Sequence, residues 1–388
     1  MSDRSSIVAF RNNEFSYLIS GNLWFRDARH RESQKGQPLV AQPIVVPTFQ
    51  DGRAVPRAGE RLTRDAYGRP MTYLRISLTD RCNLRCVYCM PAMGAKFAPK
   101  EELLSDEEIM AVVKAAEKIG FNKIRLTGGE PTIRPHVVDL VREIASLPGI
   151  DDITMTTNGL LLKRLAQPLK DAGLTRVNVS IDTLDAAKFT QITRGGKIQK
   201  VWEGIEAAAE AGLSPIKLNA VVVRGQNDLE VGDLAGLSMD NPWQMRFIEV
   251  MPLDGVDDVH DDGLVTTAET IDLIEDQFDA KLEPLEAPAG DPARIYRLPG
   301  AQGTVGFISP VSEPFCAFCN RIRLTSDGKL RLCLLRNDEV DVRDILRGGG
   351  NEDDLIEQIR YGVWRKPWGH GLLEGDRNMG RGMSQIGG

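Results

Sequence analysis

The 388-residue sequence predicts an α/β fold, organised as a partial (βα)6 TIM-type barrel with a C-terminal extension. Three observations support this prediction. Apolar, β-branched segments alternate with helical segments, the repeat is roughly 25 to 40 residues long, and polar residues gather where almost every apolar segment ends. A doubly wound sheet has the same alternation. Six units are found instead of eight, which favours a partial barrel over a closed one.

The expected elements follow from periodicity and from turn residues. Strands are expected at 73–79, 123–127, 152–157, 176–181, 216–223 and 244–250. Helices are expected at 105–120, 136–147, 159–173 and 201–212, with one more before the sixth strand. Ser105 and Glu108 form a capping-box pattern at the start of the first helix, and Gly120 ends it. Pro168 predicts an irregularity in the third helix.

Three regions are expected along the chain. Residues 1–65 mix charge, proline and glutamine without a clean period, which is typical of a flexible leader or linker. Residues 66–299 form the partial barrel, and residues 300–388 form a C-terminal region with a glycine-rich end. The polar strand ends of the barrel region are 82–89, 128–130, 156–158, 180–182 and 249–251, and barrel enzymes build their sites on that rim.

Composition excludes several classes of protein. The net charge of −7 argues against generic nucleic-acid binding. No apolar run approaches the length of a membrane span. Four acidic residues before position 33 count against an organellar transit peptide, so we expect a cytoplasmic protein. The six cysteines fall into two groups of three, which favours metal sites over disulfides.

The first cysteine group, Cys82, Cys86 and Cys89, has the spacing C-x3-C-x2-C directly after the first strand. Three thiolates can ligate three irons of a [4Fe–4S] cluster and leave the fourth iron open. An open coordination position is typical of a catalytic metal site. The alternatives are a zinc knuckle that takes a fourth ligand from elsewhere, or a chance grouping.

The second group, Cys316, Cys319 and Cys333, has the spacing C-x2-C-x13-C. It again provides three thiolates, so a second [4Fe–4S] cluster with one open iron is the simplest interpretation. A zinc site is the alternative, with His370 or His260 as the fourth ligand, although neither has close ligand spacing.

Several cations lie in or at the ends of the expected strands. They are Arg75, Arg125, Lys217, Arg321 and Arg323. The chain has neither G-x-x-x-x-G-K nor G-x-G-x-x-G, so a bound nucleotide would need side chains to neutralise its phosphates. Because alternate strand residues point to the same side, these cations are expected to converge on an anionic ligand. Scattered salt bridges are the alternative.

Taken with RLTGGEP at 125–131, the first cysteine motif resembles that of the radical S-adenosylmethionine (SAM) superfamily. The resemblance implies that the open iron chelates SAM and that one electron from the cluster yields a 5′-deoxyadenosyl radical. It assigns Tyr88, Gly129, Ser180 and Met251 to SAM, and Glu130 to securing its loop.

A narrower resemblance covers Arg69 to Gly388. The motifs RISLTDRCNLRCVYCMP, IRLTGGEPTIRP, TTNGLLL, VNVSIDTLD, RFIEVMP, FCAFCNRIRLTSDGKLRLCL and the terminal IGG resemble the GTP 3′,8-cyclases of molybdenum cofactor biosynthesis. These lyase-type enzymes convert GTP to 3′,8-cyclo-7,8-dihydro-GTP after hydrogen abstraction from ribose C3′. The resemblance assigns Arg75, Arg125, Thr156, Lys217, Arg321 and Arg323 to GTP, lets the second cluster anchor the purine, and places Gly387 and Gly388 in the active site.

The resemblance also implies partners. These are an electron donor of the flavodoxin or ferredoxin type and a downstream cyclic pyranopterin monophosphate synthase, and a homodimer is left open. Two other functions are considered: another radical SAM enzyme with an auxiliary cluster, and a non-catalytic zinc-binding protein. Thr132 departs from the pattern, because an apolar residue is expected there.

Overall fold

A computed structural model describes residues 63–91, 96–251, 263–288, 290–375 and 380–387. These residues belong to one compact unit, which comprises residues 56–388. Nearly all of the expected leader, together with His260 and Gly388, lies outside the described residues.

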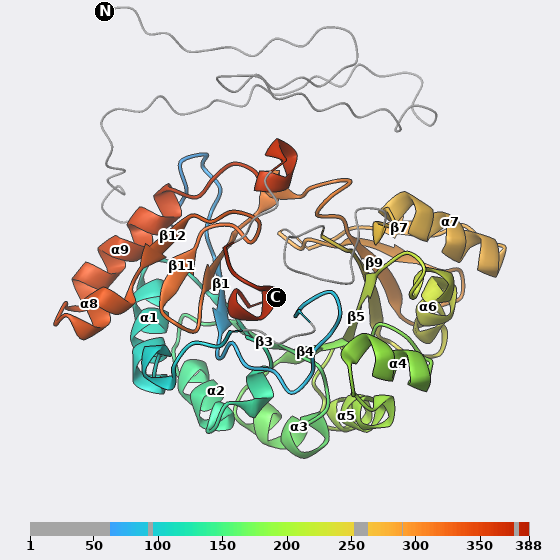
Figure 1. The fold of residues 1–388 in the computed structure, drawn as a ribbon, viewed down its shortest axis with the longest axis horizontal. Helices are drawn as coiled ribbons and strands as arrows, with labels where there is room; N and C mark the ends of the chain where they lie inside the picture. The colour runs from blue at the N-terminus through green and yellow to red at the C-terminus, as the bar shows by residue number, and fades with distance from the viewer. Residues whose placement is uncertain (1–62, 92–95, 252–262, 289, 376–379, 388) are drawn as a thin grey trace, which may run out of the picture. The chain divides into compact units, whose positions relative to one another are not determined.

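Six parallel strands form the centre of the sheet and pair in sequence order. They are β1 (Tyr73–Ser77), β2 (Lys123–Thr127), β3 (Asp152–Thr157), β4 (Arg176–Ser180), β5 (Lys217–Val222) and β6 (Gln244–Glu249). Each strand lies within one residue or two of the range expected from the sequence. The helices between them are α1 (Asp106–Lys118), α2 (Val137–Ala145), α3 (Leu162–Asp171), α4 (Ala186–Thr193), α5 (Ile198–Glu210) and α6 (Val231–Asp240). They lie along the outer side of the curved sheet (Figure 1).

The sheet continues beyond the six strands at both edges. Strand β9 (Thr304–Ile308) runs parallel to β6, and β10 (Arg321–Leu324) runs parallel to β1. Antiparallel strands β8 (Arg294–Arg297) and β7 (Glu283–Leu285) end one edge, and β11 (Lys329–Arg331) and β12 (Glu339–Asp341) end the other. Within the described ranges, twelve strands form one sheet whose end strands, β7 and β12, do not pair with each other. The prediction of a partial barrel is therefore confirmed.

Helices α7 (Thr267–Phe278), α8 (Arg343–Arg347) and α9 (Glu352–Trp364) complete the longer elements. Short 3-10 helices connect the rest: η1 (Lys100–Glu102), η2 (Pro131–Ile133), η3 (Asp228–Glu230), η5 (Cys316–Phe318), η6 (Gly371–Glu374) and η7 (Met383–Gln385). No helix among the described residues combines the length and the apolar character needed to cross a bilayer.

Local signals in the sequence explain where the helices begin and end. The Ser105 hydroxyl accepts a hydrogen bond from the Glu108 amide at 3.2 Å, and the Glu108 carboxylate accepts one from the Ser105 amide at 2.8 Å. This capping box satisfies two amides that the first turn of α1 leaves without a partner. Gly120 follows α1 with φ +100°, a conformation that favours glycine. Pro168 lies inside α3, where the sequence predicts an irregularity.

The main core lies between the sheet and its outer helices. It is built from fully buried Ile, Leu, Val and Met side chains such as Ile76, Leu126, Met155, Val179 and Leu218 on consecutive strands. Burial of each such side chain contributes about 1.5–3 kcal/mol. Because neighbouring residues of a strand point to opposite sides, the polar residues beside them face the inner side of the sheet. That inner side carries the candidate site.

Candidate active site

A row of three arginines crosses three adjacent strands on the inner side of the sheet. Arg323 on β10 is in register with Arg75 on β1, and Arg75 is in register with Arg125 on β2. Two residues earlier on the same strands, Arg321 of β10 is in register with Tyr73 of β1. The guanidinium groups of Arg125 and Arg321 lie 5.7 and 5.6 Å from the centre of the Tyr73 ring, so the tyrosine contributes a cation–π platform.

These arginines lie in a strongly positive environment. Arg125, Arg321 and Arg323 are all at most 8% exposed, and among the described residues no carboxylate lies within salt-bridge distance of any of the three. Burial and the neighbouring Arg321 lower the pKa of Arg323 to about 10. The buried Nε atoms of Arg125 and Arg321 have no hydrogen-bond partner in the part of the chain that the structure describes. Buried cations of this kind are stabilised when an anion binds between them.

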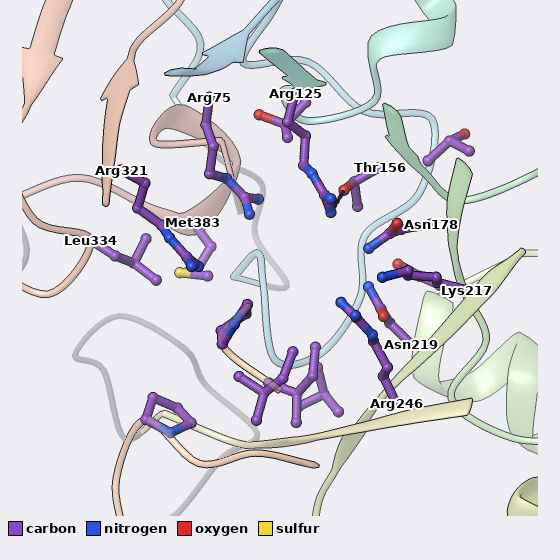
Figure 2. A pocket seen from close by; sticks show the side chains of 18 of the residues that line it. Arg75, Arg125, Thr156, Asn178, Lys217, Asn219, Arg246, Arg321, Leu334 and Met383 are labelled. Atoms are coloured by element: carbon purple, nitrogen blue, oxygen red, sulfur yellow. Dashed lines mark hydrogen bonds between the residues drawn. The ribbon is translucent and has the colours of Figure 1, made fainter. Parts of the chain in front are cut away.

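A second cationic group faces the row from β5 and β6. Arg246 donates a 2.8 Å hydrogen bond to Asp291, and Lys217 lies 3.6 Å from the same carboxylate. Burial lowers the pKa of Lys217 to about 7, and the charge of Arg246 acts in the same direction. The buried side-chain oxygens of Asn178 and Asn219 have no partner among the described residues. Figure 2 shows Lys217, Arg246 and both amides on one side of the cavity, opposite Arg75 and Arg321.

The first cysteine loop follows β1 and is packed against the loop after β2. The Gly129 amide donates to the Thr79 carbonyl at 2.6 Å, and the Glu130 amide donates to the Arg81 carbonyl at 2.8 Å. A Cβ atom on Gly129 would lie 2.2 Å from the Arg81 carbonyl oxygen, so only glycine allows this approach. The GGE segment thereby positions the loop that carries Cys82.

Glu130 secures this arrangement from a fully buried position. One carboxylate oxygen accepts from the Thr132 amide and hydroxyl and from the Thr157 hydroxyl, at 3.0, 2.5 and 2.7 Å. The other accepts from the Asn158 amide at 2.7 Å. Glu130 therefore joins the ends of β2 and β3. The departure at Thr132 has a structural reason, because its hydroxyl is one of the donors to this carboxylate.

The donor set of the first loop fits an iron–sulfur cluster. Cys82, Cys86 and Cys89 are half-buried free thiols that line one cavity. Burial raises the pKa of all three thiols, and at Cys86 and Cys89 the charge of the neighbouring thiolates adds to it, bringing the pKa of Cys89 to about 12. Three such thiolates require a bound cationic group. Among the described residues no three His, Cys, Asp or Glu side chains converge on a single ion position. A cubane cluster needs no such convergence, because each iron takes one thiolate.

Tyr88, between the last two cysteines of this loop, is fixed by a buried carboxylate. Its hydroxyl donates a 2.7 Å hydrogen bond to Asp182, whose other oxygen accepts from the Val221 amide at 2.9 Å. Burial raises the pKa of Asp182 to about 6. Ser180, at the end of β4, and Met251, after β6, line the same cavity. All four positions expected to contact SAM therefore border the first cysteine loop or its cavity.

The second cysteine group lies beside β10 and β11. Cys316 is the first residue of η5, Cys319 directly follows η5, and Cys333 lies two residues after β11. Their chain neighbours Phe315, Asn320 and Leu334 line the cavity. The cavity therefore extends from the first cysteine loop to the residues next to the second cysteine group.

Nearby cations stabilise the second cysteine group. Buried Lys366 donates a 2.7 Å hydrogen bond to the carbonyl of Leu332, the residue before Cys333. Burial alone would raise the pKa of Cys319, but the charges of Lys366 and Arg321 override it and bring the value to about 7. Burial and the neighbouring thiolates raise the pKa of Cys316 to about 11. The three thiols, with nearby positive charge, also fit an iron–sulfur cluster.

The C-terminal segment enters the cavity. The Gly387 carbonyl accepts hydrogen bonds from Arg323 at 2.7 Å and from Arg75 at 3.3 Å. In Figure 1 this terminal segment lies within the curve of the strands, near the label C. The tail, which composition alone would describe as frayed, thus contacts two of the arginines.

The cavity has a volume of about 640 Å³ and brings most of the predicted site residues together. Its lining includes Arg75, Cys82, Cys86, Tyr88, Cys89, Arg125, Gly129, Thr156, Ser180, Lys217, Met251, Arg321 and Arg323. Thr156 accepts a 3.5 Å hydrogen bond from Arg125 (Figure 2).

Four residues that line the cavity were not predicted from the sequence: Tyr73, Asn178, Asn219 and Arg246. A charged residue inside an otherwise apolar strand, the signal that identifies Arg125, would also have identified Arg246.

The chain is similar to known proteins over most of its length. Residues 76–237 match the Radical SAM superfamily, and residues 243–372 match the Molybdenum Cofactor Synthesis C family. A GTP 3′,8-cyclase of Pelotomaculum thermopropionicum is 50% identical over 326 residues, which cover 84% of this chain and 100% of that protein. A GTP 3′,8-cyclase of Alkaliphilus oremlandii is 45% identical over 326 residues, with the same coverage of both chains.

The chain belongs to the GTP 3′,8-cyclase family. Molybdenum cofactor biosynthesis protein 1 of Bos taurus is also similar, with 44% identity over 86% of this chain and 53% of that protein. Streptococcus suis SuiB bound to S-adenosylmethionine shares the fold, with a TM-score of 0.52 and 16% identity over 75% of this chain and 68% of that chain.

Membership in the GTP 3′,8-cyclase family, within the radical SAM superfamily, implies SAM and an iron–sulfur cluster as cofactors. Family membership also favours the cyclase over the two other functions considered from the sequence, another radical SAM enzyme and a non-catalytic zinc-binding protein.

Proposed function

We propose that this protein converts GTP to 3′,8-cyclo-7,8-dihydro-GTP with SAM, the first step of molybdenum cofactor biosynthesis. The observation that carries the proposal is the position of the row Arg323, Arg75 and Arg125. This row shares one cavity with the first cysteine loop, so an anion held by the row lies in the space that the loop borders.

Arginine and lysine side chains hold the substrate in this account. A triphosphate brings several negative charges, and the guanidinium groups offer paired donors that match phosphate oxygens. Arg75, Arg125, Arg321, Arg323 and Lys217 are the proposed GTP ligands, together with Thr156, and we add Arg246 because it faces the same space. The amide oxygens of Asn178 and Asn219, which no described residue contacts by a hydrogen bond, provide acceptors for hydroxyl or amino groups of the nucleoside.

Two [4Fe–4S] clusters are proposed, held by Cys82, Cys86 and Cys89 and by Cys316, Cys319 and Cys333. When bound, the first cluster and SAM supply one-electron chemistry that removes a hydrogen atom from ribose C3′, and the open iron of the second offers a site for the purine. Tyr88, Gly129, Ser180 and Met251 are proposed to hold SAM. The protein positions the ribose and encloses the reacting groups in a cavity lined by its own side chains.

The tail is proposed to take part as well. Gly387 lies against Ser77 and Thr127, the last residues of the paired strands β1 and β2, and its carbonyl contacts two arginines. Its position beside proposed GTP ligands is consistent with a role for Gly387 and Gly388 in the reaction, although Gly388 lies outside the described residues.

Partners, location and domain boundaries expected from the sequence stay part of the proposal. They are an electron donor of the flavodoxin or ferredoxin type, a downstream cyclic pyranopterin monophosphate synthase, a cytoplasmic location, and the regions 1–65, 66–299 and 300–388. A homodimer remains an option.

An anaerobic assay tests the proposal. Reconstituted protein is incubated with SAM, dithionite and either GTP or ATP, and nucleotides are separated by mass. We expect 5′-deoxyadenosine together with an isomer of the GTP mass, and no conversion of ATP. Formation of 5′-deoxyadenosine with GTP unchanged would contradict the substrate assignment, and absence of both products would contradict the reaction class.

A further inference from the structure

One side chain of the C-terminal segment, Arg381, holds that segment to the protein through two carboxylates. Its guanidinium donates to both oxygens of Asp327, at 3.1 and 2.9 Å, and to Glu339 at 3.0 Å. Its Nε lies 2.8 Å from the other oxygen of Glu339. All five donors of a guanidinium lie in one plane, so contacts with two carboxylates fix its orientation as well as its position.

The two carboxylates are themselves fixed by the sheet. Asp327 lies in the turn between β10 and β11, and Glu339 begins β12. Glu339 also accepts a 2.8 Å hydrogen bond from Arg331, which is only 1% exposed. Burial alone would raise the pKa of Asp327, but the hydrogen bond from Arg381 overrides it and lowers the value. The carboxylate is therefore held in its charged form beside Arg381.

The residues after Arg381 lead directly to the arginine row. Met383 lines the cavity, Ile386 is buried, and the Gly387 carbonyl contacts Arg323. Gly387 lies six positions after Arg381 in the chain, and six residues span at most about 20 Å. The strand that carries Arg323 is β10, and the turn that follows it carries Asp327. One hairpin thus binds both ends of this segment.

We propose that Arg381 is a positioning residue that anchors the C-terminal segment so that Gly387 reaches Arg323 and Arg75. An anchored segment meets its binding site at the high effective concentration of an intramolecular contact. Without the anchor, the segment keeps the buried Ile386, the contacts of the Gly387 carbonyl and a 3.0 Å hydrogen bond from the Gln385 side chain to the Lys96 carbonyl. The proposal extends the proposed function, because it names the residue on which the placement of the tail depends.

Hydrogen exchange of the full-length protein tests the anchor without any turnover. Arg381→Met removes the guanidinium, and Asp327→Asn removes one carboxylate charge while Arg381 remains. In both variants we expect the amides of residues 383–387 to exchange about tenfold faster or more, a change that corresponds to the loss of one charged hydrogen bond. The matched control is Arg347→Met, since Arg347, in α8, makes comparable bonds to the Glu108 carboxylate and to the carbonyls of Glu101 and Leu103. Unchanged exchange in both anchor variants would overturn the proposal.

Turnover separates failure of the inference from failure of the proposed function. We expect Arg381→Met to form 5′-deoxyadenosine yet to lose about tenfold or more of GTP conversion, while Arg347→Met equals the wild type. If the wild type leaves GTP unchanged, the proposed function fails, and the exchange result still tests the anchor. If the wild type converts GTP and Arg381→Met converts it equally well, the positioning role is overturned.

Chemical rescue distinguishes an anchor from a local charge effect. Added guanidinium can occupy the space between Asp327 and Glu339 in Arg381→Ala, but it has no covalent link to the tail. We therefore expect guanidinium to leave GTP conversion low, whereas Arg381→Lys restores part of it. Full recovery with free guanidinium would show that charge neutralisation suffices and would overturn the proposal.

Discussion

The Nη1 atom of Arg323 lies 2.7 Å from the Gly387 carbonyl oxygen, and so connects a strand of the barrel with the last turn of the chain. Arg75, in register with Arg323, reaches the same carbonyl at 3.3 Å. The C-terminal segment therefore belongs to the cavity wall as much as the strands do.

Removal of one arginine should weaken GTP binding. Arg321 is buried, and its Nε atom has no partner among the described residues, so a phosphate or purine acceptor gains a charge-assisted hydrogen bond there. We expect Arg321→Ala to cost ~1.5–3 kcal/mol of GTP affinity, about 10- to 150-fold in Kd. Equilibrium binding in the absence of SAM measures this.

Arg297→Ala provides the control for that measurement, because Arg297 is exposed on β8 and does not line the cavity. Its GTP affinity should equal that of the wild type. An Arg321→Ala protein that binds GTP as tightly as the control would remove Arg321 from the site.

GTP affinity should fall as the pH rises above neutrality. In the ligand-free protein burial lowers the pKa of Lys217 to about 7, so the amine is mostly neutral at higher pH. A bound phosphate favours the charged form and raises this pKa, and between the two values binding takes up a proton. Calorimetry at about pH 8 in two buffers with different ionisation heats measures that proton.

The sign of this linkage is fixed by the direction of the shift. Affinity is highest below pH 7, where Lys217 is already protonated, and decreases by up to about tenfold for each pH unit above it. Lys217→Met should abolish the proton uptake. Equal uptake in wild type and variant would assign the proton to another group.

Loss of a single thiol should disable the first cluster alone. Cys82→Ala removes one of three ligands, so we expect about four irons per chain in place of about eight. SAM cleavage should be abolished, because the remaining thiols belong to an incomplete set or to the second group. Iron and sulfide analysis with a 5′-deoxyadenosine assay measures both effects, and retained SAM cleavage would refute the ligand role.

The tail should be needed for GTP chemistry and dispensable for the clusters. Deletion of Gly387 and Gly388 removes the carbonyl on Arg75 and Arg323, so we expect full iron content and no cyclisation. Gly387→Ala should act in the same direction, because Gly387 has φ +70° and a Cβ would lie 2.5 Å from the Thr127 hydroxyl. Full turnover of the truncated protein would eliminate any role of the tail.

The sequence could predict the six central strands because each is a short β-branched segment bounded by turn residues. It could not predict that β9 and β10 continue the sheet, since those strands are separated from β6 and β1 by many residues and their pairing is a tertiary contact. The same limit explains why Arg323 and Arg75 could be assigned individually while their shared register could not.

Site residues were predictable where chemistry and spacing coincide, as in the two cysteine groups. Tyr73 and Asn178 were missed because such residues in a strand usually serve packing or hydrogen bonding, and only the cavity distinguishes them. Asp291 was missed for another reason. It lies outside the strands and reaches Lys217 and Arg246 only through the folded chain.

Isotope transfer shows whether the arginine row presents ribose C3′ of GTP to the chemistry supplied at the first cysteine loop. GTP deuterated at C3′ is incubated anaerobically with SAM, dithionite and the reconstituted protein, and the 5′-deoxyadenosine is analysed by mass spectrometry. The account predicts one deuterium in 5′-deoxyadenosine and its loss from the cyclised nucleotide. Unlabelled 5′-deoxyadenosine beside GTP that keeps its deuterium would contradict it.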